Sequence, residues 1–437
     1  MFYTMNISEK IYNKSFHLFL LVIASMMIFR KPCTWIIILF VLFGLFFYKR
    51  IKLSKTALSL GLIIASPLLL EILFFWNNDS LLLGLKSIEK YTSLLIFPLL
   101  LLGNHKRVNI FKLLQGYSIL TTCILFFYFI RFIVVYPQYI QKYLNGIHLW
   151  EMGYVFSNSI GIHAPALNMH LAFVCIICFY FTVLNFSEKR SILQKTLSII
   201  LFLFSFFFVL FVNTRMALFQ SIVGFVIVFF YEVLKRYSIK KVLLIFVSIV
   251  FFVTGMLYIF IKENPYMKEK YSTITFANMD KVGKLDEIKD PQIVAFNSLV
   301  TRVSIWKSAL ELSIENLPFG VGSSDGRPEL VNYYKKTNQK FLAKYEFPTH
   351  NQYIDFLLKF GLLGLVVVIF YITTIGYIGY KTKNTIIVFF FFLFLTSNLT
   401  DDFLIRFDGI AFSGFWFSVF GALWLQKFND CKELQAV

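Results

Sequence analysis

The chain has 437 residues, of which 58% are hydrophobic and 15% are charged, and its mean hydropathy is +0.71. A soluble globular domain cannot bury so much apolar surface, so these values exclude that class and indicate a polytopic, all-α membrane protein. The net charge of +18 does not indicate nucleic-acid binding. The basic residues lie mostly in short turns between apolar runs, where they set orientation and contact membrane lipids.

Apolar runs close to the 20 residues that cross a bilayer recur along the chain. The N-terminal segment lacks the small-residue cleavage site of a signal peptide, so we expect the first span to be retained. We expect about twelve transmembrane helices, near residues 15–29, 33–48, 56–76, 91–103, 113–136, 165–186, 193–212, 216–234, 241–261, 351–379, 384–400 and 409–426.

The short loops between these spans alternate between rich and poor in Lys and Arg. The rich loops share a side with both ends of the chain, which predicts cytoplasmic termini. The sequence therefore predicts three parts. These are an N-terminal transmembrane bundle of about nine spans (1–261), a long periplasmic loop (262–350), and C-terminal transmembrane helices with a cytoplasmic tail (351–437).

The long loop contains one strong helical pattern, "SLVTRVSIWKSALELSIENLPFGVG" at 298–322. Its apolar residues recur at steps of three and four, which predicts an amphipathic helix that lies on the membrane surface or packs over the bundle. The predicted apolar face is formed by Val303, Trp306, Leu310, Ile314 and Leu317. Pro318 and the glycines after it end the helix.

His350 stands where this loop meets the next apolar run, in "PTHNQYIDFLLKFGLLG". Thr349 and Gln352 fit a capping box, which makes His350 the first residue of a helix. The positive end of a helix dipole disfavours imidazolium, and a neutral ring can accept a proton from a hydroxyl. Position alone is equally compatible with a histidine that only belongs to the helix cap.

Two arginines lie on the same outer side. Arg215, in "FVNTRMALFQ", occupies a short turn between two spans, and Arg302 begins the amphipathic helix. Arginine binds phosphate groups in a bidentate manner and keeps its charge, which makes both residues candidates for an anionic substrate. Interfacial arginines that extend toward water are the alternative.

A short outer turn, "TSNLTDDFLIRFDG" at 396–409, carries Asp401 and Asp402. Adjacent carboxylates can bind a metal, but a spaced ligand pattern and a second histidine are missing, so no metal is expected. A carboxylate that orients a histidine is the favoured role. His163 and His170, at the start of the sixth span, are candidates for an acceptor or glycan site, together with Asn351 and Tyr353 beside His350.

Four stretches in this order resemble the bacterial O-antigen ligase and polymerase family: "NTRMALF" (213–219), "TRVSIWKSALELSIENLPFGVGSSD" (301–325), "HNQYIDFLLKFGLLGL" (350–365) and "NLTDDFLIRFDG" (398–409). The resemblance covers roughly residues 200–425. It implies an inner-membrane glycosyltransferase with a helical fold similar to other lipid-carrier (GT-C-like) glycosyltransferases. Such an enzyme moves a glycan from undecaprenyl pyrophosphate to an acceptor hydroxyl on the periplasmic face, without a metal or other cofactor.

By the same resemblance, Arg215 and Arg302 would hold the pyrophosphate, and His350 would act on the acceptor hydroxyl. Asp401 would match an acidic position of the family, but the adjacent Asp402 could match it equally well. A ligase that acts on lipid A–core is favoured over a polymerase that joins carrier-linked repeats or a glycoprotein-directed transferase. A twelve-helix transporter is the alternative of another class, but it would place ionisable residues at mid-membrane and show an internal repeat. The sequence has no such repeat.

Overall fold

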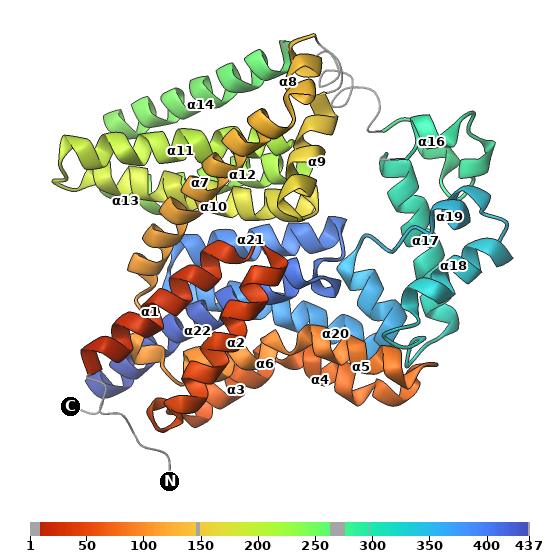
Figure 1. Cartoon of the computed structure of the whole chain (residues 1–437), viewed down its shortest axis with the longest axis horizontal. Helices are drawn as coiled ribbons and strands as arrows, with labels where there is room; N and C mark the ends of the chain where they lie inside the picture. The colour runs from red at the N-terminus through yellow and green to blue at the C-terminus, as the bar shows by residue number, and fades with distance from the viewer. Residues whose placement is uncertain (1–8, 146–148, 263–275, 297, 436–437) are drawn as a thin grey trace.

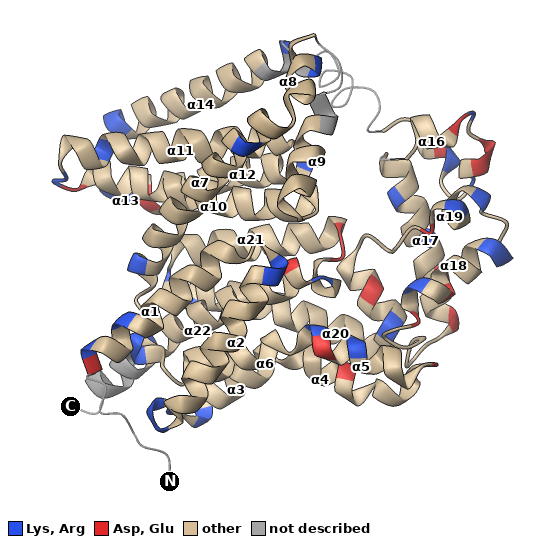
Figure 2. Cartoon of the chain, in the orientation of Figure 1, with Lys and Arg blue, Asp and Glu red and all other residues tan. Residues whose placement is uncertain are grey.

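The computed structural model describes residues 9–145, 149–262, 276–296 and 298–435, and every regular element in these ranges is helical. Figure 1 shows a bundle of long helices and, at its right-hand end, a smaller outer unit that contains α16 to α19. Charged residues gather on the outer unit and near the ends of the bundle helices (Figure 2). The expected all-helical membrane protein with a long, partly helical loop is confirmed.

Seven helices in the described ranges are long and apolar enough to cross a bilayer. They are α7 (Ile110–Val135), α10 (Ala164–Ser187), α11 (Ile192–Val212), α12 (Arg215–Val228) with its continuation to Arg236, α14 (Ile239–Lys262), α20 (Gln352–Thr382) and α22 (Phe407–Gln435). An eighth is added if α3 (Lys55–Ile64) and α4 (Ser66–Leu73), which are bent by 64°, form one broken span.

The expected number of twelve spans is not confirmed. The other helices of the bundle are too short or insufficiently apolar to count as spans on their own. They are α1 (Glu9–Met26), α2 (Arg30–Phe46), α5 (Leu81–Tyr91), α6 (Ser93–Leu102), α8 (Pro137–Leu144), α9 (Leu149–Ile160) and α21 (Thr385–Thr400). The predicted spans at 56–76 and 91–103 fall on α3–α4 and on α6; Pro67 lies in the first turn of α4, directly after the bend, and Pro98 lies inside α6.

The centre of the bundle is formed by α10 and α22. Their apolar windows are 89% and 83% buried within the protein, against 6% for α14 at the edge of the bundle (Figure 1). Phe173 of α10 packs edge-to-face against Trp416 of α22, with ring centroids 5.1 Å apart. Such aromatic pairs contribute about 0.5–1.5 kcal/mol beyond their buried area. The helices that end at the candidate site are therefore held by a rigid interior.

α20 is broken at Gly361, where φ is +63° and ψ is −149°. The loop after α17 docks into this break and satisfies the backbone groups that the break releases. Three backbone hydrogen bonds join them: Val321 N to Leu358 O (2.9 Å), Gly322 N to Lys359 O (3.0 Å) and Leu362 N to Pro318 O (3.2 Å). A Cβ on Gly361 would lie 1.8 Å from the Pro318 oxygen, so only glycine fits.

The outer unit has its own core, formed by α17 (Leu299–Glu315), α18 (Gly326–Lys336) and α19 (Lys340–Tyr345), with α16 (Pro291–Val294) beside them. The predicted apolar stripe on α17 is not its buried face, because Leu310 and Ile314 are 39% and 66% exposed. Ile305 and the small residues Ser304 and Ser308 face inward instead. Small side chains let the neighbouring helices approach closely, and this favours the face with lower hydropathy.

The start of α1 and the last part of α22 lie at the same end of the bundle (Figure 1). Glu9, the first residue of α1, forms an ion pair with Arg107 at 2.6 Å. Gln426 of α22 donates a hydrogen bond to the carbonyl oxygen of Val108 at 2.9 Å. Because Arg107 and Val108 are neighbours, both ends of the described chain meet one loop. Their cytoplasmic location stays a prediction.

Candidate functional site

The catalytic candidate His350 lies directly before α20, at the end of the bundle that faces the outer unit. Its Nδ1 atom lies 3.3 Å from Oδ1 of Asp401, the residue that follows α21. The predicted capping box is wrong. Asn351 is the N-cap of α20, its side chain accepts from the backbone N–H groups of Tyr353 and Ile354, and His350 precedes it with a left-handed φ of +47°. The ring thus lies outside the first turn of α20, in contact with the Asp401 carboxylate.

The residues after His350 fasten the start of α20 to the turn after α21. Asn351 Nδ2 donates to the Leu399 carbonyl at 3.2 Å, and the Tyr353 hydroxyl donates to the Leu395 carbonyl at 3.3 Å. These contacts are to backbone, and neither residue lines the cavity described below.

Gln352 makes a further link, which the sequence reasoning did not identify. It is fully buried, its Oε1 accepts from Leu404 N at 2.6 Å, and its Nε2 donates to Asp355 Oδ2 at 3.4 Å. Three consecutive side chains therefore fix the distance between His350 and Asp401. Consecutive polar residues at the start of a helix are the sequence signal that could have identified the role of Gln352.

Asp401 and Asp402 are both buried but differ in their partners. Burial raises the pKa of Asp401, but the hydrogen bonds from His350 and from the backbone N–H of Asp402, together with the positive charge of Arg406, outweigh it and hold the pKa below the usual range. Burial and the neighbouring Asp401 charge raise the pKa of Asp402 well above its usual range. Neither carboxyl oxygen of Asp402 has a hydrogen-bond partner in the described ranges. Of the two carboxyl groups, Asp401 therefore favours the ionised form and Asp402 favours the protonated form.

His350, Asp401 and Asp402 each offer one ligand atom, and these atoms all lie within 4.8 Å of one another. One imidazole and two carboxylates are donors that a divalent cation accepts. Binding would require Asp402 to lose its proton, which its burial opposes. The three side chains can thus act either as a hydrogen-bonded acid–base cluster or as a partial metal site.

A cavity of about 290 Å³ opens beside Asp401. It lies between the starts of α10, α12 and α17 and the end of α21. Arg215 and Arg302, which are 87 positions apart in the sequence, both line it, and so does Asp401. The Arg302 guanidinium also donates to the Thr400 carbonyl oxygen, next to Asp401. The structure therefore brings both predicted arginines to the predicted carboxylate.

The start of α12 is the second cationic feature of this cavity. Arg215 is its first residue, and Met216 and Ala217, in its first turn, also line the cavity. The N-cap, Thr214, makes no side-chain bond to the first turn, because its hydroxyl accepts from Asn168 Nδ2 at 2.8 Å. The N–H groups of this turn and the helix dipole thus add a positive potential at the cavity wall.

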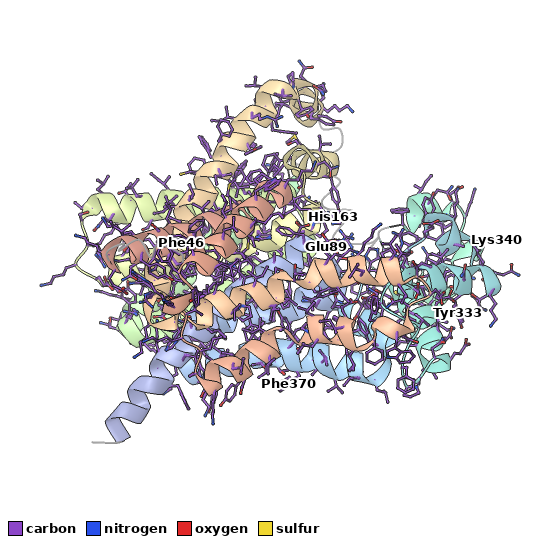
Figure 3. All side chains as sticks on the ribbon, turned by 60° about the horizontal axis from the view of Figure 1, so that its bottom comes forward. Phe46, Glu89, His163, Tyr333, Lys340 and Phe370 are labelled. Atoms are coloured by element: carbon purple, nitrogen blue, oxygen red, sulfur yellow. The ribbon has the colours of Figure 1, made fainter. Side chains whose placement is uncertain are left out.

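The two other histidine candidates take different positions. His163, labelled in Figure 3, is the N-cap of α10, and its ring centroid lies 6.4 Å from that of the cavity-lining Tyr154. Desolvation and the charge of Arg406 lower the pKa of His163, while Asp401 raises it. His170 is fully buried, packs on Phe412 with centroids 4.1 Å apart, and does not line the cavity. The structure brings only His163 toward the site.

In a comparison with protein families, residues 199–369 match the model of the family described as O-antigen ligase. The matched segment includes Arg215, Arg302 and His350, whereas Asp401 lies beyond its end. Comparison with curated proteins gives no match. The family implies a glycan-transferring enzyme that uses a lipid-linked glycan and a lipid acceptor. The match over residues 199–369 thus supports assignment of this multi-pass membrane protein to the O-antigen ligase and polymerase family.

Proposed function

We propose that the protein is an O-antigen ligase of the bacterial inner membrane. It transfers a glycan from undecaprenyl pyrophosphate to a hydroxyl group of lipid A–core, at the periplasmic face, with both termini in the cytoplasm. The observation that carries this proposal is a cavity lined by Arg215, Arg302 and Asp401, with His350 next to it in contact with Asp401. Two fixed cations suit a pyrophosphate, and an oriented imidazole suits a hydroxyl.

The acid–base chemistry follows from the His350–Asp401 contact. When Nδ1–H donates to Asp401, the lone pair of the ring is on Nε2, which can accept the acceptor hydroxyl proton. The ionised Asp401 then stabilises the imidazolium that forms. A positioned base of this kind contributes about 10²- to 10⁴-fold to the rate.

The group transfer balances as a single displacement. A bond forms between the acceptor oxygen and the anomeric carbon while the bond from that carbon to the pyrophosphate oxygen breaks. The hydroxyl proton goes to His350, and the electron pair leaves with undecaprenyl pyrophosphate. Arg215, Arg302 and the start of α12 stabilise the charge that grows on the leaving group. Attack from the opposite face inverts the anomeric configuration.

An apolar groove of about 210 Å³ between α12 and α14 supports a site for the polyprenyl chain. It is lined by apolar side chains and one threonine: Ile222, Phe225, Val226, Phe229, Phe230, Phe246, Ile249, Val250, Val253 and Thr254. α12 carries Arg215 at one end and this groove along its length. A lipid carrier can therefore place its headgroup and its tail along one helix.

The test is a lipopolysaccharide gel from the native host. It compares the wild type, a gene deletion, and the deletion complemented with His350→Ala or with His17→Ala as a control at the opposite end of the bundle. We expect deletion and His350→Ala to leave bare lipid A–core, and His17→Ala to restore the ladder at equal expression. Core that carries a single repeat unit would instead identify a polymerase, and an unchanged ladder would contradict both functions.

Metal independence is tested separately with purified protein and lipid-linked donor. Because the arginines and the start of α12 supply the positive charge, we expect EDTA to leave the transfer rate unchanged. A loss of activity in EDTA that added Mg²⁺ or Mn²⁺ restores would assign His350, Asp401 and Asp402 to a metal site.

A further inference from the structure

A cavity of about 470 Å³ lies away from the candidate site, between α3, α20 and α22. Its volume falls within the roughly 300–1,000 Å³ of small-molecule sites. It opens on the outer surface of the bundle, where Phe370 of α20 is 52% exposed (Figure 3). It is lined by Thr56, Ser59, Leu60, Ile63, Phe370, Thr373, Thr374, Tyr377, Ile378 and Trp424. We call this surface the α3–α20 groove.

The polar side chains of the α3–α20 groove do not indicate a polar occupant. Ser59 donates to the Lys55 carbonyl at 3.0 Å, one turn earlier in α3. Thr373 and Thr374 donate to the carbonyls of Ile369 and Phe370 at 2.8 and 2.7 Å. These three hydroxyls are satisfied within their own helices, so the wall they present is largely aliphatic and aromatic. A hydrocarbon chain fits such a wall.

Three lysines lie next to the lining residues of the groove, one on each helix that forms it. Lys55 directly precedes the lining residue Thr56. Lys381 Nζ lies 5.6 Å from the ring centroid of the lining residue Tyr377. Lys427, one turn after Trp424, donates to the Thr382 carbonyl at 2.6 Å. None of the three forms an ion pair with a described carboxylate.

An apolar groove that ends in unpaired cations is complementary to a lipid with an anionic headgroup. Tyr377 and Trp424 add the amphipathic aromatic rings that lie at headgroup depth in membrane proteins. Long lysine side chains can follow the groove wall and place their ammonium groups at the phosphate level. We propose that the α3–α20 groove binds an anionic phospholipid, with one acyl chain in the groove and the phosphate at Lys55 and Lys381. This site is independent of the transfer reaction.

The experiment uses full-length protein, purified in detergent and stripped of lipid, and native mass spectrometry. Phosphatidylglycerol is compared with phosphatidylcholine of the same acyl chains at equal concentrations. We expect phosphatidylglycerol to bind more tightly. Each basic residue near an anionic lipid contributes about fivefold to affinity, so Lys55→Gln with Lys381→Gln should weaken phosphatidylglycerol binding about thirtyfold and leave phosphatidylcholine unchanged. Lys427 is left intact because it stabilises the end of α20.

Two controls separate the site from general charge effects. Lys31→Gln with Lys86→Gln removes the same charge outside the groove and should leave binding unchanged. Thr374→Trp fills the groove with the lysines intact and should abolish the preference for phosphatidylglycerol. As a control for folding, each variant without bound lipid should have the same melting temperature as the lipid-free wild type. Equal binding of both phospholipids, or full binding by the Lys55 and Lys381 variant, overturns the proposal. Tighter competition by undecaprenyl phosphate would assign the groove to the polyprenyl carrier instead.

Discussion

At the scale of single residues, the acidic pair shows how local contacts divide similar side chains. Asp401 contacts His350, while Asp402 has no hydrogen-bond partner for either carboxyl oxygen in the described ranges, and burial raises its pKa. The sequence alone leaves either residue able to orient the histidine. Although they are adjacent in the sequence, only Asp401 contacts the imidazole of His350.

This difference predicts the activity of two matched variants. Asp401→Asn removes the ionised group that orients His350, so we expect kcat to fall by about 10²- to 10⁴-fold. Asp402→Asn replaces a protonated acid with a neutral side chain of similar shape, and most of the activity should remain. Transfer assays with purified protein measure both. Equal losses would contradict the assigned roles.

The same pair predicts how stability depends on pH. The pKa of Asp402 is raised in the folded state, so the unfolded chain loses this proton first and stability falls as pH rises above about 4. Asp402→Asn removes that loss, and its advantage in melting temperature over the wild type should grow with pH. Asp401 has a lowered pKa, so its stabilising effect is present above about pH 4 and is lost in more acidic solution.

Melting temperatures of the two variants and the wild type, measured in detergent across this pH range, check both signs. A constant difference between Asp402→Asn and the wild type at every pH would show that Asp402 is ionised in the folded protein. Asp401→Asn should lose its deficit only at the acidic end of the range.

At the scale of elements, the break in α20 explains two glycine-containing motifs of the sequence, GVG at 320–322 and GLLG at 361–364. The segment 318–322 supplies the hydrogen bonds that the break at Gly361 requires, so each motif needs the other. Arg302 lies on the helix before this loop and His350 before the helix that contains the break. This set of hydrogen bonds, which we call the interlock, therefore joins α17, which carries Arg302, to α20, which follows His350.

Gly361→Ala should be strongly destabilising. Its positive φ is unfavourable for alanine, and the added Cβ would overlap the Pro318 carbonyl oxygen. We expect a loss of at least about 1–3 kcal/mol in stability. Gly255→Ala in α14 is the matched control, because no atom lies within 4 Å of its added Cβ, and it should be neutral or stabilising by about 1 kcal/mol. Thermal unfolding compares them, and equal effects would argue against the interlock.

At the scale of the whole molecule, the outer unit lies at one end of the bundle, and the start of α1 and the last part of α22 lie at the other (Figure 1). The positive-inside rule predicts that these ends lie in the cytoplasm and the outer unit in the periplasm. In a variant without native cysteines, Lys284→Cys should react with a membrane-impermeant maleimide in intact spheroplasts, and Lys14→Cys only after lysis. The reverse pattern would place the candidate site on the cytoplasmic side.

The sequence by itself determined the class of the protein and the candidate chemistry. Hydropathy identifies a membrane bundle because lipid selects apolar faces along every span, and the charged outer stretches name Arg215, Arg302, His350 and the acidic pair. Predictions from the sequence were wrong where contacts between distant segments determine the local structure. The bend at α3–α4 and the inward face of α17 depend on neighbours, as does the true start of α20.

Only the tertiary structure decided that residues far apart in the chain share one cavity and that Asp401, rather than Asp402, holds the histidine. The physical reason is that the spacing of apolar residues along one helix predicts only which of its faces is apolar. Which helix ends lie together depends on how the whole bundle packs.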